Sequence, residues 1–144
     1  MKNALFLLLV TALLFSCEKD DDNNNNITIT PLNISSTLSA GTWRITYYFD
    51  TDHEETANYA GYLFTFAGNN VVTATKQGAT SATGSWTTGL DDSKVKLVLV
   101  FSSPAAFVEI SDDWHVTERT DTRIKLQDVS GGNGGTDYLI FERN

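Results

Sequence analysis

The chain has 144 residues, with 10 lysine and arginine residues against 18 aspartate and glutamate residues, and its formal net charge is −8 at neutral pH. An acidic surface repels phosphate backbones and anionic lipid head groups, so the composition argues against nucleic acid as a partner and against membrane binding through a basic patch. Any contact with a membrane therefore requires a different feature, and the N-terminus provides a candidate.

The first sixteen residues have the pattern of an export signal. Lys2 gives a basic start, and a twelve-residue apolar run follows over residues 4–15. The run is too short for a membrane-spanning helix, which needs about 20 apolar residues. An ordinary cleavage site is also a poor fit, because Leu14 stands where a small residue is preferred. The single cysteine of the chain, Cys17, comes directly after Ser16.

The sequence Leu14-Phe15-Ser16-Cys17 resembles the lipobox of bacterial lipoproteins. The resemblance implies that residues 1–16 are a signal peptide and that Cys17 becomes the lipidated N-terminus, carrying acyl chains such as palmitate. Two or three acyl chains form a stable anchor, since each buried methylene contributes about 0.8 kcal/mol. Removal of residues 1–16 deletes Lys2 and no acid, so 9 basic and 18 acidic side chains remain, a formal charge of −9.

Residues 17–37 are predicted to form a disordered tether rich in aspartate and asparagine. The run Asp20–Asn26 contains no aromatic residue and no apolar side chain that could build a core. The acidic residues behind Lys19 resemble the surface-export signal of Bacteroidota lipoproteins, and a generic solvated spacer is the alternative. The resemblance implies a protein anchored in the bacterial outer membrane and exposed at the cell surface.

Residues 38–144 are predicted to form one all-β domain. Aromatic and β-branched residues recur in short runs that are separated by glycine, asparagine and aspartate. In the first run, period-2 alternation places Trp43, Ile45, Tyr47 and Phe49 on one face. The eight expected strands cover residues 41–49, 62–66, 71–76, 82–87, 95–101, 114–119, 123–128 and 137–143.

The connections favour antiparallel pairing. Residues 68–70, 120–122 and 130–135 have turn chemistry, and only residues 102–113 have room for a helix, with Ser103 as its cap and Pro104 at its first position. Parallel folds need longer crossovers and are disfavoured. An eight-stranded antiparallel up-and-down barrel is therefore expected, with a β-sandwich as the alternative.

The domain resembles the lipocalin-like group of the calycin superfamily. Gly41-Thr42-Trp43 matches the G-x-W that opens the first lipocalin strand, and Thr120-Asp121 matches the pair between strands six and seven. Arg143 matches the basic residue near the last strand. The resemblance implies that Trp43 fills the closed end of the barrel with Arg143 stacked on its ring. The chain departs from classical lipocalins because no long helix follows the eighth strand.

Two functions remain open from the sequence. In the first, the barrel binds a small apolar or amphipathic ligand in a pocket lined by aromatic side chains, namely Tyr47, Phe49, Tyr62, Trp86 and Trp114. In the second, these side chains fill the barrel core and the domain is an interaction module that contacts a protein or a glycan. The two hypotheses differ in whether the interior is hollow.

No catalytic residues, metal ligands or cofactors are assigned. The acidic segment Asp50–Glu55 lacks the glycine of an EF-hand loop and is interpreted as solvated. Asp91-Asp92 and Asp112-Asp113 are interpreted as turn and cap residues. The glycine-rich run Gly131–Gly135 lacks the features of a phosphate loop and is expected to be a flexible hairpin.

Catalysis has little support from the sequence. His53 and His115 cannot be paired with a nucleophile by their spacing. A pair of carboxylates for glycoside hydrolysis would have to come from Glu109, Glu118 and Asp121, whose distances in space do not follow from the sequence. The protein is therefore expected not to be an enzyme.

Overall fold

The strands close into a ring in which every neighbour is antiparallel. The computed structural model describes residues 28–79, 81–129 and 135–144. Within these residues the sheet order follows the sequence from β3 to β9, and β1 pairs with both β3 and β9. The expected eight-stranded up-and-down barrel is confirmed, and the β-sandwich alternative is wrong. The predicted signal peptide, Cys17, tether residues 17–27 and Gly131–Gly134 lie outside the described residues.

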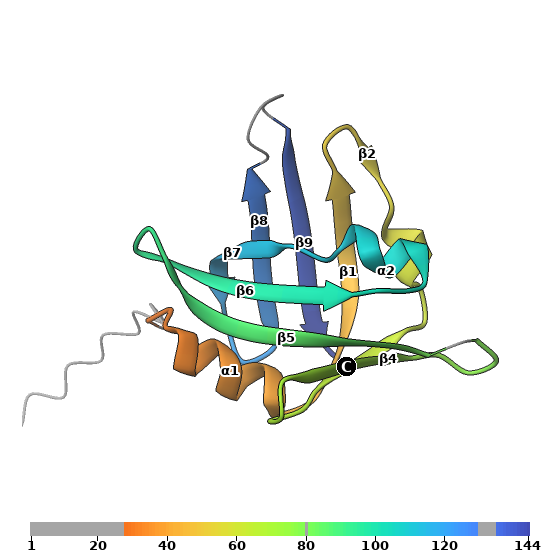
Figure 1. The fold of residues 1–144 in the computed structure, drawn as a ribbon, viewed down its shortest axis with the longest axis horizontal. Coiled ribbons are helices and arrows are strands. Elements are labelled where there is room, and N and C mark those ends of the chain that lie inside the picture. Colours follow the sequence, from red (N-terminus) through yellow and green to blue (C-terminus); the bar gives the residue numbers. More distant parts are fainter. Residues whose placement is uncertain (1–27, 80, 130–134) are drawn as a thin grey trace, which may run out of the picture.

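The elements are arranged along the chain with short connections (Figure 1). They are α1 (Pro31–Ser39), β1 (Thr42–Asp50), β2 (His53–Glu54), the 3₁₀ helix η1 (Thr56–Tyr59), β3 (Leu63–Phe66), β4 (Val71–Thr75), β5 (Ala82–Asp91), β6 (Lys94–Phe101), α2 (Ala105–Glu109), β7 (Asp113–Arg119), β8 (Arg123–Val129) and β9 (Thr136–Arg143). The two-residue strand β2 forms a hairpin with the end of β1 and is an addition to the eight barrel strands.

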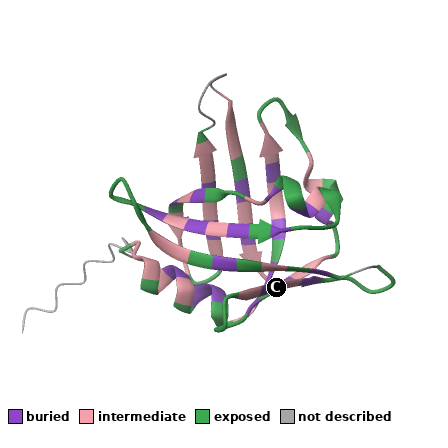
Figure 2. Ribbon diagram, viewed as in Figure 1, coloured by how far each residue is buried: buried purple, intermediate pink, exposed green. Residues whose placement is uncertain are grey.

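The side chains alternate between the barrel interior and the surface along most strands. Figure 2 shows the alternation as purple bands on the strands. Strand β9 lies between β8 and β1. Its residues Leu139 and Phe141 are fully buried, whereas Tyr138 is exposed. Opposite residues of an antiparallel pair lie on the same face of the sheet, so the register assigns each neighbouring side chain to the inside or the outside.

The first strand changes phase at a β-bulge. The pairing of β1 with β9 shifts between Ile45 and Tyr47, so Trp43, Ile45 and Tyr48 are the buried residues of this strand. The prediction that Tyr47 and Phe49 share a face with Trp43 and Ile45 is wrong. A bulge inserts one unpaired residue, and each residue after it turns to the opposite face.

Helix α1 extends the domain beyond its predicted N-terminal boundary. Residues 31–37, predicted as part of the disordered tether, form most of this helix. Thr30 caps it by accepting a hydrogen bond from the Asn33 backbone N–H at 3.2 Å, and Pro31 stands in its first turn. Ile34 and Leu38 are spaced one turn apart and are completely buried. The predicted boundary at residue 38 is therefore wrong, because the long polar run before Ile34 conceals the start of the helix in the sequence pattern.

The closed end of the barrel is centred on Trp43. Its indole N–H donates a hydrogen bond to the Leu38 carbonyl of α1 at 2.9 Å, and the Arg143 guanidinium lies 5.3 Å from its ring centroid. This is the cation–π geometry that the lipocalin resemblance implied. A Cβ atom at Gly41 would lie 3.3 Å from Arg143 Nε, so the glycine of the G-x-W leaves room for the arginine.

The turn between β7 and β8 holds the Thr120-Asp121 pair. The Thr120 hydroxyl accepts a hydrogen bond from the Thr122 backbone N–H at 3.3 Å, and the Thr120 N–H donates to the Arg123 carbonyl at 2.8 Å. An Asp121 carboxylate oxygen lies 3.7 Å from the Arg119 guanidinium. Arg119 Nε in turn donates to the Thr37 hydroxyl at 2.7 Å, which connects this turn to α1.

Because α1 packs against the barrel, its buried residues contribute to stability. We expect Ile34→Ala to lower the free energy of unfolding by about 2–4 kcal/mol, because it leaves a cavity between α1 and the barrel. Leu32→Ala is the matched control, since Leu32 is in the same helix and is 75% exposed, and it should change stability by less than about 0.5 kcal/mol. Urea denaturation of both variants tests this, and equal midpoints would contradict the packing of α1.

Candidate functional site

Two of the five predicted pocket residues belong to the packed core. Trp86 is 3% exposed and donates its indole N–H to the Ala67 carbonyl at 3.0 Å. Trp114 is 1% exposed and donates to the Ile110 carbonyl, also at 3.0 Å. Both rings point inward, as predicted, but both are enclosed by neighbouring side chains and have their polar atom satisfied by backbone.

The short helix α2 packs aromatic side chains into one flank of the barrel. Phe107 is buried and contacts four aromatic rings at centroid distances of 5.0–5.9 Å, namely Tyr59, Tyr62, Phe64 and Phe101. Tyr62, the third predicted pocket residue, is half-buried with its ring edge against Phe107, and the Lys76 ammonium lies 5.4 Å from its centroid. The predicted helix is confirmed, although Pro104 is its cap residue and not its first residue.

Two buried tyrosine hydroxyls hold α2 in place. The Tyr48 hydroxyl donates to the Glu109 carbonyl at 3.1 Å, and the Tyr59 hydroxyl donates to the Ala106 carbonyl at 2.5 Å. Burial is the main cause that raises the pKa of both tyrosines, and nearby carboxylates such as Asp50 and Glu109 raise it further. Both hydroxyls therefore remain protonated and act as donors. Sequence reasoning did not identify this arrangement, because it joins segments far apart in the chain.

The remaining two predicted pocket residues lie on the outside of the barrel. After the bulge in β1, Tyr47 and Phe49 face outward, with their rings parallel to within 7° and their centroids 6.4 Å apart. Tyr138 of β9 pairs with Phe49, is 41% exposed, and lies 6.5 Å from the Phe49 ring. Ile140 pairs with Tyr47 on the same side. We call these four residues the outer aromatic face.

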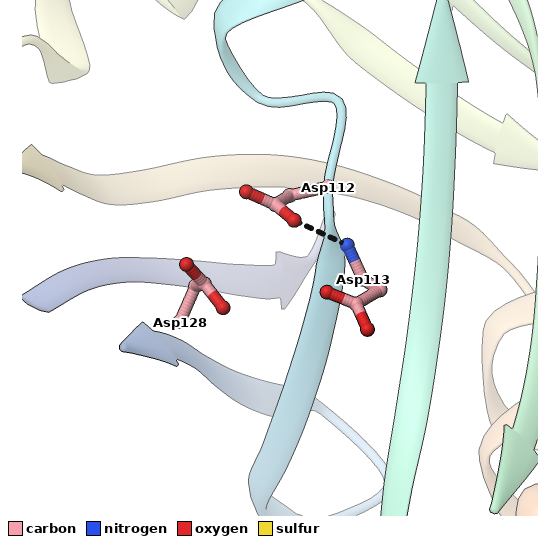
Figure 3. Close-up of side chains that lie close together, drawn as sticks. All are labelled: Asp112, Asp113 and Asp128. Carbon is pink, nitrogen blue, oxygen red and sulfur yellow. Dashed lines mark hydrogen bonds between the residues drawn. The ribbon is translucent and has the colours of Figure 1, made fainter. Parts of the chain in front are cut away.

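A group of carboxylates lies where β7 begins and β8 ends. Side-chain oxygens of Asp112, Asp113 and Asp128 lie within 4.8 Å of one another (Figure 3). Asp112 accepts a hydrogen bond from the Asp113 backbone N–H at 2.7 Å. No helix begins here, because Asp112 lies in the bend before β7 and Asp113 is the first residue of that strand, so neither of them is a helix cap. Carboxylate oxygens at this spacing are the ligand type that calcium prefers. The sequence did not show that β7–β8 pairing brings Asp128 to the other two.

The position of Asp112 in this cluster changes its pKa. Partial burial raises the pKa of Asp112, and the neighbouring Asp128 and Asp113 carboxylates add to the shift, while the Asp113 N–H opposes it. The ionised form of Asp112 is therefore disfavoured in the folded protein relative to the unfolded chain. At neutral pH the group costs stability.

The acidic loop predicted as solvated is an exposed hairpin containing a histidine between two carboxylates. His53 Nε2 lies 2.9 Å from Glu55, and its Nδ1 lies 2.5 Å from Asp52. These hydrogen bonds raise the pKa of His53. Desolvation and a hydrogen bond with Glu55 raise the pKa of Glu109, which connects the hairpin to α2.

The three carboxylates considered for glycoside hydrolysis have separate partners. Glu109 pairs with Glu55, and Asp121 lies beside Arg119. Glu118 lies 2.6 Å from the Lys125 ammonium and 3.7 Å from Arg123 Nε. Their observed partners do not join them into one acid–base pair.

Comparisons with known proteins support the fold. No family model matches the chain, and no curated protein matches it. The chain is similar to the solved structure of a DUF4847 family protein from Bacteroides vulgatus, with a TM-score of 0.51 and 15% identity over 77% of this chain and 97% of that chain. It also resembles a lipocalin-like protein from Bacteroides uniformis, with a TM-score of 0.44 and 17% identity over 75% and 99% of the two chains.

The fold class follows from the topology together with the first of these similarities. The chain forms a closed, eight-stranded antiparallel up-and-down barrel. At 15% identity, the likeness to the DUF4847 family protein extends to the fold alone. None of the helices in residues 28–79, 81–129 and 135–144 is long and apolar enough to cross a membrane.

Neutralising Asp112 should stabilise the protein. We expect Asp112→Asn, which keeps an acceptor for the Asp113 N–H, to raise Tm by about 1–3 °C at pH 7.5. The gain should disappear at about pH 3.5, because Asp112 is then protonated in the folded state and largely protonated in the unfolded chain. Thermal unfolding at both pH values measures the effect. Asp91→Asn removes the same charge outside the cluster and should leave Tm near the wild-type value, so an equal gain from both variants would refute the local cause.

Proposed function

We propose that this protein is a lipid-anchored binding lipoprotein of the bacterial cell surface, in which a filled barrel serves as a scaffold and the partner binds on its outer surface. The observation that carries the proposal is the packing of the interior. The two tryptophans predicted to line a pocket, Trp86 and Trp114, are buried and hydrogen-bonded to backbone carbonyls. No enzymatic activity and no cofactor are part of the proposal.

The barrel core consists of side chains in mutual contact. The inward residues of all eight barrel strands join with Ile34 and Leu38 of α1 and Phe107 of α2 in one cluster of buried apolar residues. Phe64 and Phe66 each form an edge-to-face contact with Phe141 across the interior, at 5.3 and 5.6 Å. A ligand in the barrel centre would have to displace these rings, at a cost set by the lost packing. Binding at the surface has no such cost.

The outer aromatic face is the surface feature that suits this role. Aromatic side chains are enriched among the residues that contribute most to binding, because they bury a large area with little loss of side-chain freedom. Tyr47, Phe49 and Tyr138 are half-buried or exposed, although all three could have been placed in the core by a different strand phase. Their position outside the barrel leaves them accessible to a partner.

The proposed anchor is Cys17. The lipobox resemblance supports lipidation at this residue, and Lys19 with the acids behind it supports export to the outer surface of the outer membrane. Ten residues lie between Cys17 and Thr28, the first described residue, so covalent geometry limits the distance between the two Cα atoms to about 40 Å. The binding surface would accordingly operate close to the membrane.

Membrane fractionation tests the anchor. We expect Cys17→Ala to move the protein from the membrane pellet to the soluble or secreted fraction, because no acyl chains can be attached. Ser16→Ala keeps a small residue before the cleavage position and should remain in the pellet. If Cys17→Ala stays in the membrane fraction to the same extent as the wild type, the lipoprotein proposal is wrong.

Native mass spectrometry tests the filled barrel. The full chain, purified from its host in mild detergent, should have the same mass under native and denaturing conditions, before and after incubation with a mixture of fatty acids, retinoids and sterols. Covalent acyl chains remain attached in both conditions and do not confuse the comparison. A hollow lipocalin treated in parallel is the positive control. A mass difference that disappears on denaturation would instead establish an interior ligand.

A further inference from the structure

We propose that the outer aromatic face is a binding site for an uncharged glycan chain, with Gln127 and His115 as its hydrogen-bonding partners. The inference rests on the proposed function, since it names the class of partner for the outer surface of the barrel. Its evidence is the arrangement of rings, polar groups and charges on four neighbouring strands.

Three neighbouring rings on the outer face provide aromatic surface for contact with a sugar, with Tyr138 tilted by 51° to Phe49. A pyranose ring has a face of C–H groups and a rim of hydroxyls, and the C–H face packs on the electron-rich face of an aromatic ring. Tyr47 and Phe49 are parallel to within 7° along β1, and Tyr138 continues the apolar surface onto β9. The bulge in β1 places the first two rings outward, so this aromatic surface belongs to the strand geometry and not to a loop.

Polar side chains without a charge continue the same row across the sheet. The register aligns Phe49 with Tyr138, Tyr138 with Gln127, and Gln127 with His115. The four side chains are on the outer face because Leu126 and Leu139, one residue away, are buried. Amide and imidazole groups both donate and accept hydrogen bonds, as sugar hydroxyls do. Desolvation, with Lys94 and Lys96 nearby, lowers the pKa of His115 and keeps it neutral at pH 7.

Several of the charged side chains around this row form ion pairs with one another. Arg44 lies 3.7 Å from Glu142, and Lys125 lies 2.6 Å from Glu118. On the far side, the Lys96 ammonium lies 3.4 Å from Asp113. The row ends at two charged residues, Glu54 opposite Phe49 and Lys96 opposite His115, and the strip between them carries no formal charge. In a protein with a net charge of −8 this strip suits a neutral ligand, whereas an anionic polymer would be repelled by the whole molecule.

The size of the strip favours a glycan over a protein. Neighbouring strands lie about 4.8 Å apart, so the strip extends roughly 10 Å across the sheet from Phe49 to Gln127. Along β1, the two-residue step from Phe49 to Tyr47 gives it a width of about 7 Å. The resulting area is on the order of 100 Å², far below the roughly 800 Å² that each partner buries in a stable protein complex. A few sugar rings match this area.

Affinity electrophoresis of the full chain in mild detergent tests the site. The gels contain neutral polysaccharides, namely dextran, laminarin, soluble starch and galactomannan, or the anionic polymers polygalacturonate and alginate. We expect retardation by at least one neutral polymer and by neither anionic polymer. Tyr47→Ala and Tyr138→Ala should each weaken this binding at least about tenfold, because each removes one stacking ring.

Three variants separate stacking from other effects. Tyr138→Phe keeps the ring and should bind within about threefold of the wild type, whereas Gln127→Ala should weaken binding through the loss of a hydrogen-bonding group. Leu90→Ala removes an apolar side chain that is 69% exposed at the end of β5, away from the outer aromatic face, and should leave binding unchanged. Thermal unfolding of each variant verifies that the barrel is intact.

The possible outcomes distinguish this inference from the proposed function. No retardation by any neutral polymer, or retardation by the anionic polymers alone, overturns the glycan site. Binding of a protein that is lost in Tyr47→Ala overturns the glycan as occupant and leaves outer-surface binding in place. An interior ligand detected by native mass spectrometry overturns the proposed function itself.

Discussion

The indole of Trp43 is the contact on which the closed end of the barrel depends. One side chain connects three parts of the chain, because its N–H is bonded to Leu38 of α1, its ring lies beneath Arg143 of β9, and its backbone belongs to β1. β1 and β9 are also the two strands that must pair to close the ring. Trp43 therefore contributes both to the pairing of β1 with β9 and to the docking of α1.

The bulge in β1 determines which chemistry faces water. Before it, the strand places Trp43 and Ile45 inside; after it, Tyr48 turns inward and its hydroxyl reaches Glu109 of α2. The same change of phase moves Tyr47 and Phe49 to the surface. One unpaired residue thus contributes to two separate features, the attachment of α2 to the barrel and the outer aromatic face.

The sequence was sufficient to predict the architecture because strand patterns and turn residues are local signals. Eight strands, the short helix before β7 and the contact between Trp43 and Arg143 all followed from nearby residues or from the lipocalin resemblance. The change of phase in β1 could not be predicted from the sequence, because a bulge depends on the pairing with β9 and Thr46 and Tyr47 have no local sequence signal for it. The cluster around Asp128 depends on strand pairing in the same way.

Helix α1 was missed for a different reason. Thr30-Pro31 followed by Ile34 and Leu38 is a helix signal in itself, with a cap, a first-turn proline and apolar residues one turn apart. The long polar run before it favours a tether, so the polar pattern conflicts with the helix signal at this boundary. The five predicted pocket residues lie in the core, on the flank and on the outer surface of the barrel. The sequence shows that aromatic residues are present, but it does not show which of them fill the interior.

The attachment of α1 also has a mechanical consequence. Helix α1 is the first element of the described residues, so a pulling force applied at Thr28 enters the fold at α1 and not at a barrel strand. The helix is held by the burial of Ile34 and Leu38 and by a few hydrogen bonds, such as Thr88 Oγ1 to Pro31 O at 3.1 Å, whereas each barrel strand is paired through its backbone with a strand on either side. Under load α1 would detach first and lengthen the connection, and the ring of strands that carries the outer aromatic face would be spared.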